Sequence, residues 1–271
     1  MRVGIVGCGA IGTEISKAVD EDERMELVFL IDRHPEKVEA LLHTLKKKPK
    51  FVRFSSEGFE ELLPHIDLLV ECASQSAVRE FVLPALRAGK DVLILSVGAL
   101  VDAELFEEVE RSAKENGCRV FIPSGAIVGI DGLKSGHVRR IYHVRLRTRK
   151  PPLSFKGNKH VSFKELVEIN EPKVLFRGSA KDAVQLFPEN VNVAASLSLA
   201  GIGIEKTEVE IVADPSIDKN IHEVEVEGEF GRFVTVVENV PSPSNPKTSY
   251  LAALSAIATL KGIISNIKVG T

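Results

Sequence analysis

A glycine-rich loop at the start of the chain restricts its fold more than any other segment. The stretch VGIVGCGAIGTEIS places Gly7, Gly9 and Gly12 after a short apolar run and at the opening of a helical pattern. In that context, G-x-G-x-x-G is typical of a dinucleotide-binding βαβ unit. Gly7 permits a tight turn, Gly9 lets pyrophosphate approach the backbone, and Gly12 lets helix and strand pack closely. We expect this loop, with Ala10 and Ile11, to bind the phosphates.

An acidic residue ends the next apolar run, as such a unit requires. Asp32 follows ELVFLI and is placed to accept hydrogen bonds from the adenosine ribose hydroxyls. Its alternative role is to cap a helix that starts near Pro35. Asp32 favours NAD, but Arg33 follows directly and could pair with a 2′-phosphate. The predicted cofactor is therefore NAD or NADP.

The first 125 residues alternate buried strands with helices. The short β-branched runs RVGIVG, ELVFLID, DLLVECA, DVLILSV and RVFIPS are typical of strands in a parallel sheet. Helical patterns follow at 76–90 and 102–117. We predict a doubly wound α/β domain of the Rossmann type over residues 1–125. Ligands of such sheets lie beyond the carboxyl ends of the strands. The turns there supply further candidate cofactor contacts, namely Ala73, Ser74, Ser96, Val97 and Gly98.

The sequence texture changes after Gly125 to a period of two, which indicates strands with one buried and one wet face. Such strands are expected at 141–150, 207–214, 222–228 and 232–239. One or two helices, broken at Pro188, are expected within 179–201. We predict an α+β domain over 126–240, with a mainly antiparallel sheet and helices on one side. Residues 241–271 then form an apolar final helix over 247–265, buried against the first domain or a second subunit.

Composition excludes several classes of protein. The net charge of −3 gives no reason to expect a nucleic-acid or membrane partner. No apolar stretch approaches the ~20 residues that span a bilayer, and no secretory pattern is present, so we expect a cytoplasmic protein. Cys8, Cys72 and Cys118 lie far apart without a CxxC spacing. They predict neither a disulfide framework nor a metal site.

One histidine occupies an unexpected face of a predicted strand. In NIHEVEVEG three glutamates share one face, whereas His222, Val224 and Val226 share the other. A histidine on an apolar face can be a hydrogen-bonded core residue or a catalyst. The spacing alone leaves both roles open.

Several segments in fixed order identify a family resemblance. After the glycine-rich loop come ECAS, SVGAL, PSGAIVGIDGL, NVNVAAS, NIHEVEVEGEFG and NPKTS. Over essentially its whole length the chain resembles the L-aspartate dehydrogenase family. The resemblance implies a Rossmann domain followed by an α+β domain related to those of homoserine dehydrogenase and dihydrodipicolinate reductase. It also implies a homodimer that oxidises L-aspartate to iminoaspartate, which hydrolyses to oxaloacetate and ammonia or feeds NAD biosynthesis.

The same resemblance implies roles for three residues. It makes His222 the catalytic histidine and places Ala126 and Asn192 on the nicotinamide side of the cofactor. A neutral imidazole can take a proton from the water that attacks the imine and return one to the departing amine. Among the other histidines, His137 and His143 are the competitors for this role.

A dicarboxylate substrate needs cations or N–H donors, because two buried unpaired carboxylates would be very unfavourable. Lys247 and Thr248 lie at the predicted start of the last helix, which could bind an anion or simply be capped by them. The candidate substrate-binding residues are Lys134, Ser135, Lys219, Lys247 and Thr248, with Ser249 as a further hydroxyl donor.

Two alternatives stay open at this point. One is another oxidoreductase of the same architecture, acting on a semialdehyde or on dihydrodipicolinate, although 271 residues leave little room for the longer catalytic domain of homoserine dehydrogenase. The other is a non-catalytic NAD-binding sensor, which needs the glycine-rich loop but not the segment around His222. The same candidate residues are compatible with both directions of the reaction, the oxidation of aspartate and the reductive amination of oxaloacetate.

Overall fold

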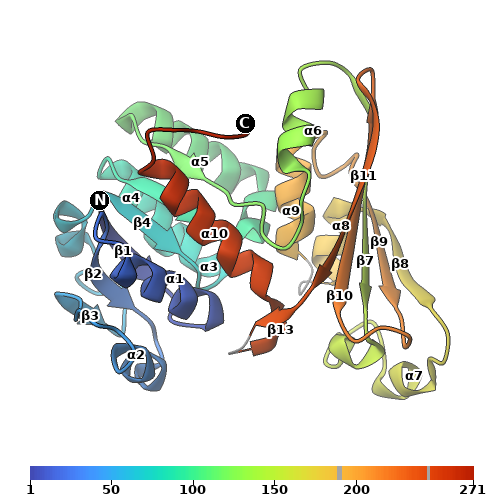
Figure 1. Ribbon diagram of the computed structural model, residues 1–271, viewed down its shortest axis with the longest axis horizontal. Coiled ribbons are helices and arrows are strands. Elements are labelled where there is room, and N and C mark those ends of the chain that lie inside the picture. Colours follow the sequence, from blue (N-terminus) through green and yellow to red (C-terminus); the bar gives the residue numbers. More distant parts are fainter. Residues whose placement is uncertain (188–190, 243–244) are drawn as a thin grey trace. The chain divides into compact units, whose positions relative to one another are not determined.

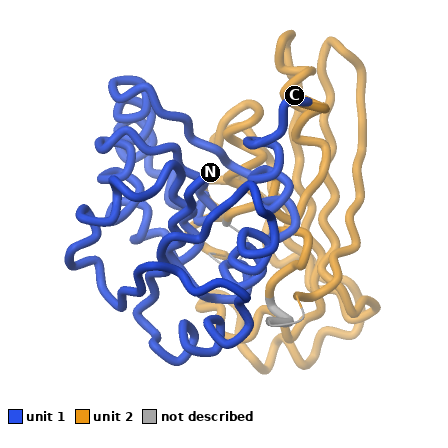
Figure 2. Tube along the Cα trace, turned by 60° about the vertical axis from the view of Figure 1, so that its left-hand side comes forward, with its two compact units in different colours: residues 1–123, 253–267 blue, residues 124–252, 268–271 orange. Residues whose placement is uncertain are grey.

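The chain divides into two compact units. The computed structural model describes residues 1–187, 191–242 and 245–271. Unit 1 comprises residues 1–123 and 253–267, and unit 2 comprises residues 124–252 and 268–271; Figure 2 shows them in blue and orange. Each unit has its own hydrophobic core.

Unit 1 contains a six-stranded sheet in the order β3-β2-β1-β4-β5-β6, and every pairing in it is parallel (Figure 1). This confirms the predicted doubly wound sheet. The strand order reverses direction between β1 and β4, the position at which such sheets bind ligands. The third strand was not predicted, because its three residues are too few to form a recognisable apolar run. The strands are β1 (Arg2–Val6), β2 (Glu26–Ile31), β3 (Phe51–Arg53), β4 (Leu68–Glu71), β5 (Asp91–Ile94) and β6 (Val120–Phe121).

Helical segments join these strands. The predicted helix at 102–117 is α5 (Ala103–Asn116): the Asp102 carboxylate accepts a hydrogen bond from Leu105 N at 3.2 Å, and Gly117 ends the helix with φ 65°. The pattern at 76–90 is a continuous helical run that includes a π-helical turn. The segments are α1 (Ala10–Glu21), α2 (Pro35–Leu42), η1 (Glu60–His65), α3 (Gln75–Ala77), η2 (Val78–Val82), α4 (Leu83–Arg87) and η3 (Val97–Val101).

The last helix, α10 (Tyr250–Ile263), contributes to unit 1 from residue 253 onwards. Ala256 and Leu260 are fully buried in the core of that unit. The helix begins three residues later than predicted. The preceding residues form the strand β13 (Asn245–Ser249), whose backbone pairs with β12 (Pro241–Ser242). Lys247 and Thr248 therefore lie in a strand rather than in the first turn of a helix.

Unit 2 contains a five-stranded sheet in the order β11-β10-β7-β9-β8. Its pairings are antiparallel except for the parallel pair β7 and β9, which confirms the mainly antiparallel prediction. Strand β8 was not predicted, because KVLFRGS lacks a clear alternation of apolar and polar residues. The strands are β7 (Ile141–Lys150), β8 (Lys173–Ser179), β9 (Glu208–Ala213), β10 (Asn220–Gly228) and β11 (Gly231–Asn239).

Helices cover one face of this sheet, as predicted. Figure 1 shows α6 (Ile130–Gly136), α8 (Ala180–Leu186) and α9 (Val191–Ala200) on the same side. The region 179–201 forms two helices, and Pro188 itself lies outside the described residues. The short helices η4 (Pro152–Phe155) and α7 (Phe163–Glu168) lie between β7 and β8 in the chain. Side chains of the sheet and helices form one hydrophobic core, which includes Leu146, Val224 and Leu197.

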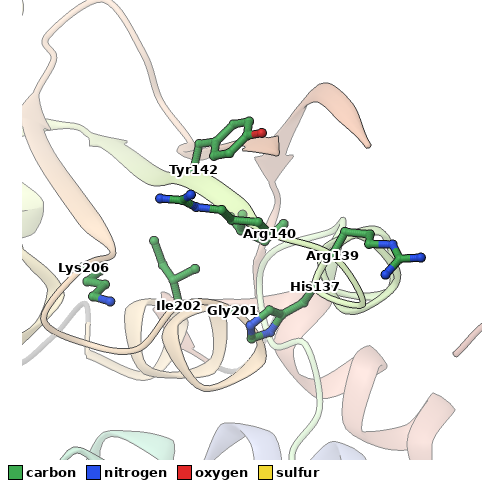
Figure 3. A pocket seen from close by; sticks show the side chains of 8 residues that line it. His137, Arg139, Arg140, Tyr142, Gly201, Ile202 and Lys206 are labelled. Atoms are coloured by element: carbon green, nitrogen blue, oxygen red, sulfur yellow. The ribbon is translucent and has the colours of Figure 1, made fainter. Parts of the chain in front are cut away.

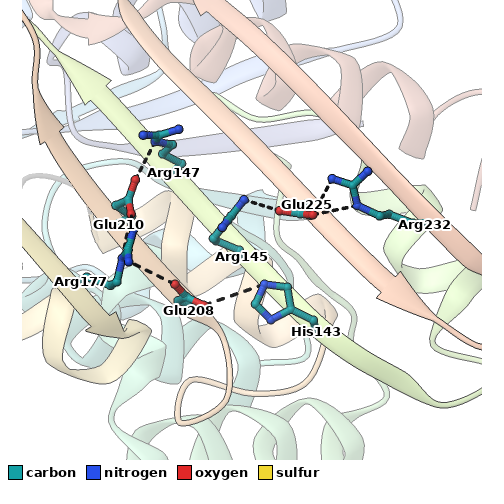
Figure 4. A network of polar contacts seen from close by, with 8 residues as sticks. All are labelled: His143, Arg145, Arg147, Arg177, Glu208, Glu210, Glu225 and Arg232. Carbon is teal, nitrogen blue, oxygen red and sulfur yellow. Dashed lines mark hydrogen bonds and ion pairs between the residues drawn. The ribbon is translucent and has the colours of Figure 1, made fainter. Parts of the chain in front are cut away.

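The opposite face of the sheet is charged and internally neutralised (Figure 4). Glu210 forms ion pairs with Arg147 and Arg177 from the strands on either side. Glu225 likewise pairs with Arg145 and Arg232, and its hydrogen bond from Arg232 holds the pKa of its carboxyl below the usual value. Arg145 and Arg147 of β7 therefore bind carboxylates of their own sheet.

Candidate active site

Each glycine of the N-terminal loop is required for a different physical reason. Gly7 has φ 103°, and a Cβ there would lie 2.6 Å from the carbonyl oxygen of Cys72. A Cβ on Gly12 would lie 1.9 Å from the carbonyl oxygen of Gly7. A Cβ on Gly9 would meet no described atom within 4 Å. The folded chain thus needs Gly7 and Gly12 for its own backbone, whereas the open space at Gly9 fits the approach of a cofactor pyrophosphate.

The first turn of α1 presents backbone N–H groups to the open space at Gly9. Gly9 is the residue before the helix and has no side chain that could cap it. Ala10, Ile11 and Gly12 form that first turn, and the first N–H groups of a helix lack intrahelical partners. These groups favour an anion at the helix N-terminus.

The Asp32 carboxylate is fixed at the carboxyl end of β2. One of its oxygens accepts a hydrogen bond from Cys8 N at 2.7 Å, and the other accepts from His34 N at 2.9 Å. Both bonds leave lone pairs on the oxygens, so the carboxylate can also accept from ribose hydroxyls. The structure thereby connects Asp32 directly to the glycine-rich loop.

A cavity of about 720 Å³ in unit 1 joins these features. Arg33 lies on its rim, with a side chain that is 70% exposed and 3.9 Å from Glu80. The lining also includes residues that follow β3, which the sequence reasoning missed because it missed that strand. The predicted residues in the lining are Gly7, Gly9, Asp32, Arg33, Ala73 and Ser74, and the unpredicted ones include His34, Lys37, Phe54, Ser55 and Ser56.

A buried carboxylate, Glu71, holds two of the predicted cofactor loops. It accepts hydrogen bonds from Ala73 N at 2.9 Å, Ser74 N at 3.1 Å, Ser96 N at 3.1 Å and Ser96 Oγ at 2.8 Å. Burial raises the pKa of this carboxyl, and the four hydrogen bonds oppose that rise. Glu71 therefore fixes the turns after β4 and β5 relative to each other. Val97 and Gly98 follow in η3.

His222 lies on the helix-covered face of the unit 2 sheet and is 3% exposed. It stands opposite Thr148 of β7 and Val237 of β11. Its Nδ1 lies 2.9 Å from Thr148 Oγ1. Burial lowers the pKa of the imidazole to about 3, and the charge of Lys150 contributes to the same shift. The ring is therefore neutral near pH 7 and held by one of its nitrogens.

The sequence reasoning missed two polar residues on the same face, Lys150 and Asn239. Lys150 is 9% exposed, and Asn239 is 3% exposed. Asn239 Nδ2 donates a hydrogen bond to the carbonyl oxygen of Ala126 at 3.1 Å, so it holds the loop that the family resemblance assigns to the cofactor. The signal was present in the strand IYHVRLRTRK, where Lys150 has the same parity as the buried residue Thr148.

The structure separates Lys134 and Ser135 from His222. Both lie in α6, and a Cβ on the next residue, Gly136, would contact Ile141 at the start of β7. Ile141 precedes Thr148, the partner of His222, by seven positions. At roughly 3.3 Å per residue this is about 23 Å of strand. The C-terminal end of the helix is therefore anchored at the other end of the sheet, whereas Gly129, just before the helix, faces Thr235 in the middle of β11.

The remaining predicted binding residues differ in exposure and lie in different elements of unit 2. Lys219 precedes β10 and lies 3.7 Å from Glu238, with a side chain that is 42% exposed. Thr248 is half-buried and Ser249 is buried, both in β13. The side chain of Lys247 lies outside the described part of the structure. Asn192 is exposed at the start of α9. Substrate and cofactor binding at these positions stays a prediction.

A basic hollow in unit 2 belongs to the opposite end of the sheet (Figure 3). Its volume is about 960 Å³, and it lies at the start of β7 rather than near Thr148. It contains His137 but none of the residues around His222. His143, the other competing histidine, lies on the charged face, 3.9 Å from Glu208 (Figure 4). The lining residues are His137, Arg139, Arg140, Ile141, Tyr142, Gly201, Ile202 and Lys206.

The described residues were searched for a membrane-spanning helix and for a cluster of metal-binding side chains. None of the described helices is long and apolar enough to cross a membrane. Within the same part of the chain, no three His, Cys, Asp or Glu side chains gather as a metal site would require.

The fold, the residues around the glycine-rich loop and the residues around His222 together define a class of protein. This class is the NAD(P)-binding oxidoreductases with a Rossmann unit and a mixed-sheet unit. Residues 7–123 match the family described as homoserine dehydrogenase, NAD binding domain, and residues 131–263 match aspartate dehydrogenase, C-terminal. The chain is 51% identical to L-aspartate dehydrogenase of Methanococcoides burtonii, with 100% of both chains covered. It therefore belongs to the L-aspartate dehydrogenase family.

Other comparisons agree with this membership. The L-aspartate dehydrogenase of Nitrosopumilus maritimus is 44% identical, over 100% of this chain and 99% of that relative. The crystal structure of aspartate dehydrogenase from Thermotoga maritima superposes with a TM-score of 0.77 at 32% identity, covering 100% and 99% of the two chains. A homoserine dehydrogenase from Thiobacillus denitrificans has a TM-score of 0.62 at 17% identity, covers 97% and 73%, and shares the fold.

The glycines allow a matched pair of substitutions. Gly12→Ala should lower the free energy of unfolding by about 1–3 kcal/mol, because its Cβ would overlap the carbonyl oxygen of Gly7. Gly9→Ala should leave stability nearly unchanged, because its Cβ meets open space, but should weaken NAD binding. Denaturant titration and cofactor titration of both variants measure this. A Gly9→Ala variant with unaltered NAD affinity would contradict the cofactor role of that space.

The low pKa of His222 predicts a pH-dependent stability. Below an ordinary pKa of 6.5 the unfolded chain binds a proton that the folded chain, with a pKa of about 3, does not bind. Acidification through this window should therefore destabilise the fold. Between roughly pH 7.5 and 5, His222 should lower the free energy of unfolding by about 2 kcal/mol. Denaturant titrations at both pH values should show this loss in the wild type but not in His222→Gln. Equal losses in the two proteins would refute the burial of a neutral imidazole.

Proposed function

We propose that the chain catalyses the NAD(P)-dependent oxidative deamination of L-aspartate to iminoaspartate, and onward to oxaloacetate and ammonia. The observation that carries this function is His222, buried on the helix-covered face of the unit 2 sheet with Thr148 Oγ1 at hydrogen-bond distance from its ring, in a chain of this family. A non-catalytic NAD-binding sensor has no use for this arrangement.

Unit 1 binds the cofactor in this proposal. The open space at Gly9, the N-terminus of α1 and the oriented Asp32 carboxylate fit the pyrophosphate and ribose of NAD or NADP. A nicotinamide bound there would supply the acceptor for the hydride that leaves Cα of aspartate. Ala126 and Asn192 remain its proposed protein contacts in unit 2. The Ala126 carbonyl is held by Asn239, which limits the movement of that loop.

His222 performs the proton transfers. Its neutral imidazole accepts a proton from the water that attacks the imine carbon and returns a proton to the departing amine. Thr148 orients the ring through Nδ1. Strands on both sides restrict its position, which suits a group that must act at a defined atom.

The cellular setting is also part of the proposal. A cytoplasmic enzyme of this kind supplies iminoaspartate to NAD biosynthesis and can run in either direction with metabolite levels. A homodimer is supported by the face of the unit 2 sheet that bears no helices. Its edge strand β11 exposes Val234 by 42% and Val236 by 56%, next to the charged network. Apolar side chains exposed on such a strand favour contact with a second copy.

Initial rates of NAD and NADP reduction test the function. The purified protein should reduce the cofactor with L-aspartate but not with L-homoserine, L-glutamate or L-malate, because the proposal assigns it an amino dicarboxylate of one length. The ratio of the NAD and NADP rates reports on Asp32 and Arg33. Activity with homoserine alone would favour the other oxidoreductase. Cofactor binding without any turnover would favour the sensor.

His222 allows a sharper test. His222→Ala and His222→Asn should lower turnover by roughly 10²–10⁴-fold, the usual loss when a general acid–base group is removed. NAD affinity should stay unchanged, because the glycine-rich loop is intact. His143→Gln is the matched control, since His143 lies on the charged face of the same sheet. Near-normal turnover in folded His222 variants would make this residue part of the core only.

A further inference from the structure

The basic hollow of unit 2 gathers cationic side chains from two segments that are distant in the chain (Figure 3). His137, Arg139 and Arg140 lie between α6 and β7, and Lys206 lies between α9 and β9. Figure 3 shows Arg140, Lys206 and His137 around Ile202, whereas the guanidinium of Arg139 points away from them. The hollow therefore has three convergent basic groups around an apolar side chain, with a fourth basic group on its rim.

These cations lack the carboxylate partners that other cations of unit 2 have. On the same strand β7, Arg145 pairs with Glu225 and Arg147 pairs with Glu210 (Figure 4). In contrast, no Asp or Glu lines the hollow, and none of its cations forms an ion pair with a residue that the structure describes. Because the whole chain carries more acidic than basic residues, a group of unpaired cations is not a consequence of composition.

Neither of two acidic neighbours, Glu205 and Glu229, forms an ion pair with the described cations of the hollow. Glu205 binds Lys181 at 2.6 Å. Glu229 meets Arg140 through its backbone N–H, which donates to the Arg140 carbonyl at 2.9 Å. The guanidinium of Arg140 lies over the ring of Tyr142, 5.8 Å from the ring centroid. The aromatic face thus holds Arg140 in position without using its N–H donors.

Helix ends account for only part of this charge. The hollow lies next to the C-terminal ends of α6 and α9, and each helix C-terminus carries about half a negative charge. Two such ends offset about one positive charge, whereas Arg139, Arg140 and Lys206 are all permanently charged. An excess of positive charge thus remains in a concave site, where low-dielectric walls concentrate the field.

We propose that the basic hollow binds the phosphates of an oligophosphate ligand, with Arg140 and Lys206 as the principal donors and His137 as a further N–H donor. Guanidinium and ammonium groups both bind phosphate through charge-assisted hydrogen bonds. The volume of about 960 Å³ is in the range of sites for small molecules and exceeds the space that one phosphoryl group needs. The net charge of −3 argues against a long nucleic acid as the ligand.

This site does not depend on the proposed function. None of its lining residues lines the cofactor cavity of unit 1. Ile141, in its lining, is seven positions from Thr148, the partner of His222, which corresponds to about 23 Å of strand. A ligand in the hollow therefore does not touch the glycine-rich loop or His222.

Isothermal titration calorimetry with inorganic triphosphate tests the proposal. The protein is first saturated with NAD, so that the pyrophosphate site of the glycine-rich loop is occupied, and divalent cations are left out. The wild type should bind one triphosphate per chain. Its affinity should fall as the salt concentration rises, because the contacts are made by exposed charges. Absence of saturable binding would overturn the proposal.

A matched pair of double variants tests the donors. Arg140→Gln with Lys206→Gln should raise the Kd of triphosphate by at least about 100-fold, because each change removes a hydrogen bond between charged groups. Both side chains are exposed, so the variant should unfold at the same denaturant concentration as the wild type. Lys46→Gln with Lys47→Gln is the control, since it removes two exposed charges of unit 1. Equal losses of affinity in the two double variants would mean that triphosphate responds to net charge alone, and would refute the site.

Three ligands distinguish the source of the phosphates. Equal affinities for triphosphate and ATP, with no binding of adenosine, would assign the hollow to phosphates alone. Tighter binding of ATP than of triphosphate would also support the proposal and would make a nucleoside part of the ligand. Binding of adenosine as strong as that of ATP would contradict phosphate recognition. If the Arg140 and Lys206 changes alter the oligomeric state in light scattering but not the triphosphate affinity, the hollow is an interface between copies of the chain and the proposal is wrong.

Discussion

The pairing register of β10 between β7 and β11 is the constraint on which the candidate site depends. Successive side chains of a strand leave on opposite faces, so a slip of one residue would exchange the two faces completely. His222 would then join the arginines and glutamates, and Glu223 would enter the core. The valines beside His222 and the ion pairs on the opposite face both favour the observed register. The face that carries His222 is thus specified by the same contacts that stabilise the sheet.

On the face of the sheet opposite His222, the arginines and glutamates neutralise one another in ion pairs. Exposed ion pairs are individually weak, but here two carboxylates, Glu210 and Glu225, are each shared between two arginines from different strands. Arg145 and Arg147 of β7 are consequently engaged within the sheet, and Arg149 pairs with Asp214 just beyond β9. This leaves Lys150 as the cation of β7 that lies on the same face as His222.

In unit 1 the constraint is different, because the loops at the carboxyl ends of the strands must pack closely together and still leave space for a ligand. The close approach of Gly12 to the Gly7 carbonyl fixes the start of α1, while Asp32 and Glu71 accept backbone N–H groups from neighbouring loops. Buried carboxylates are unfavourable without such donors. Their hydrogen bonds thus convert a set of small-residue turns into a defined binding surface.

The sequence by itself determined the features that depend on local periodicity. The parallel sheet, the mixed second sheet, the loop glycines, Asp32 and a histidine on a dry strand face all follow from residue spacing within a few turns or strands. The sequence did not predict the short strand β3 or the non-alternating strand β8, because their residues show too little periodicity. Only the tertiary structure decided which side chains surround His222. Lys150 and Asn239 come from other strands, and Lys134 and Ser135 lie in a helix whose C-terminal end contacts the start of β7. Such neighbours are set by pairing between residues distant in the chain, and a single sequence does not record that pairing.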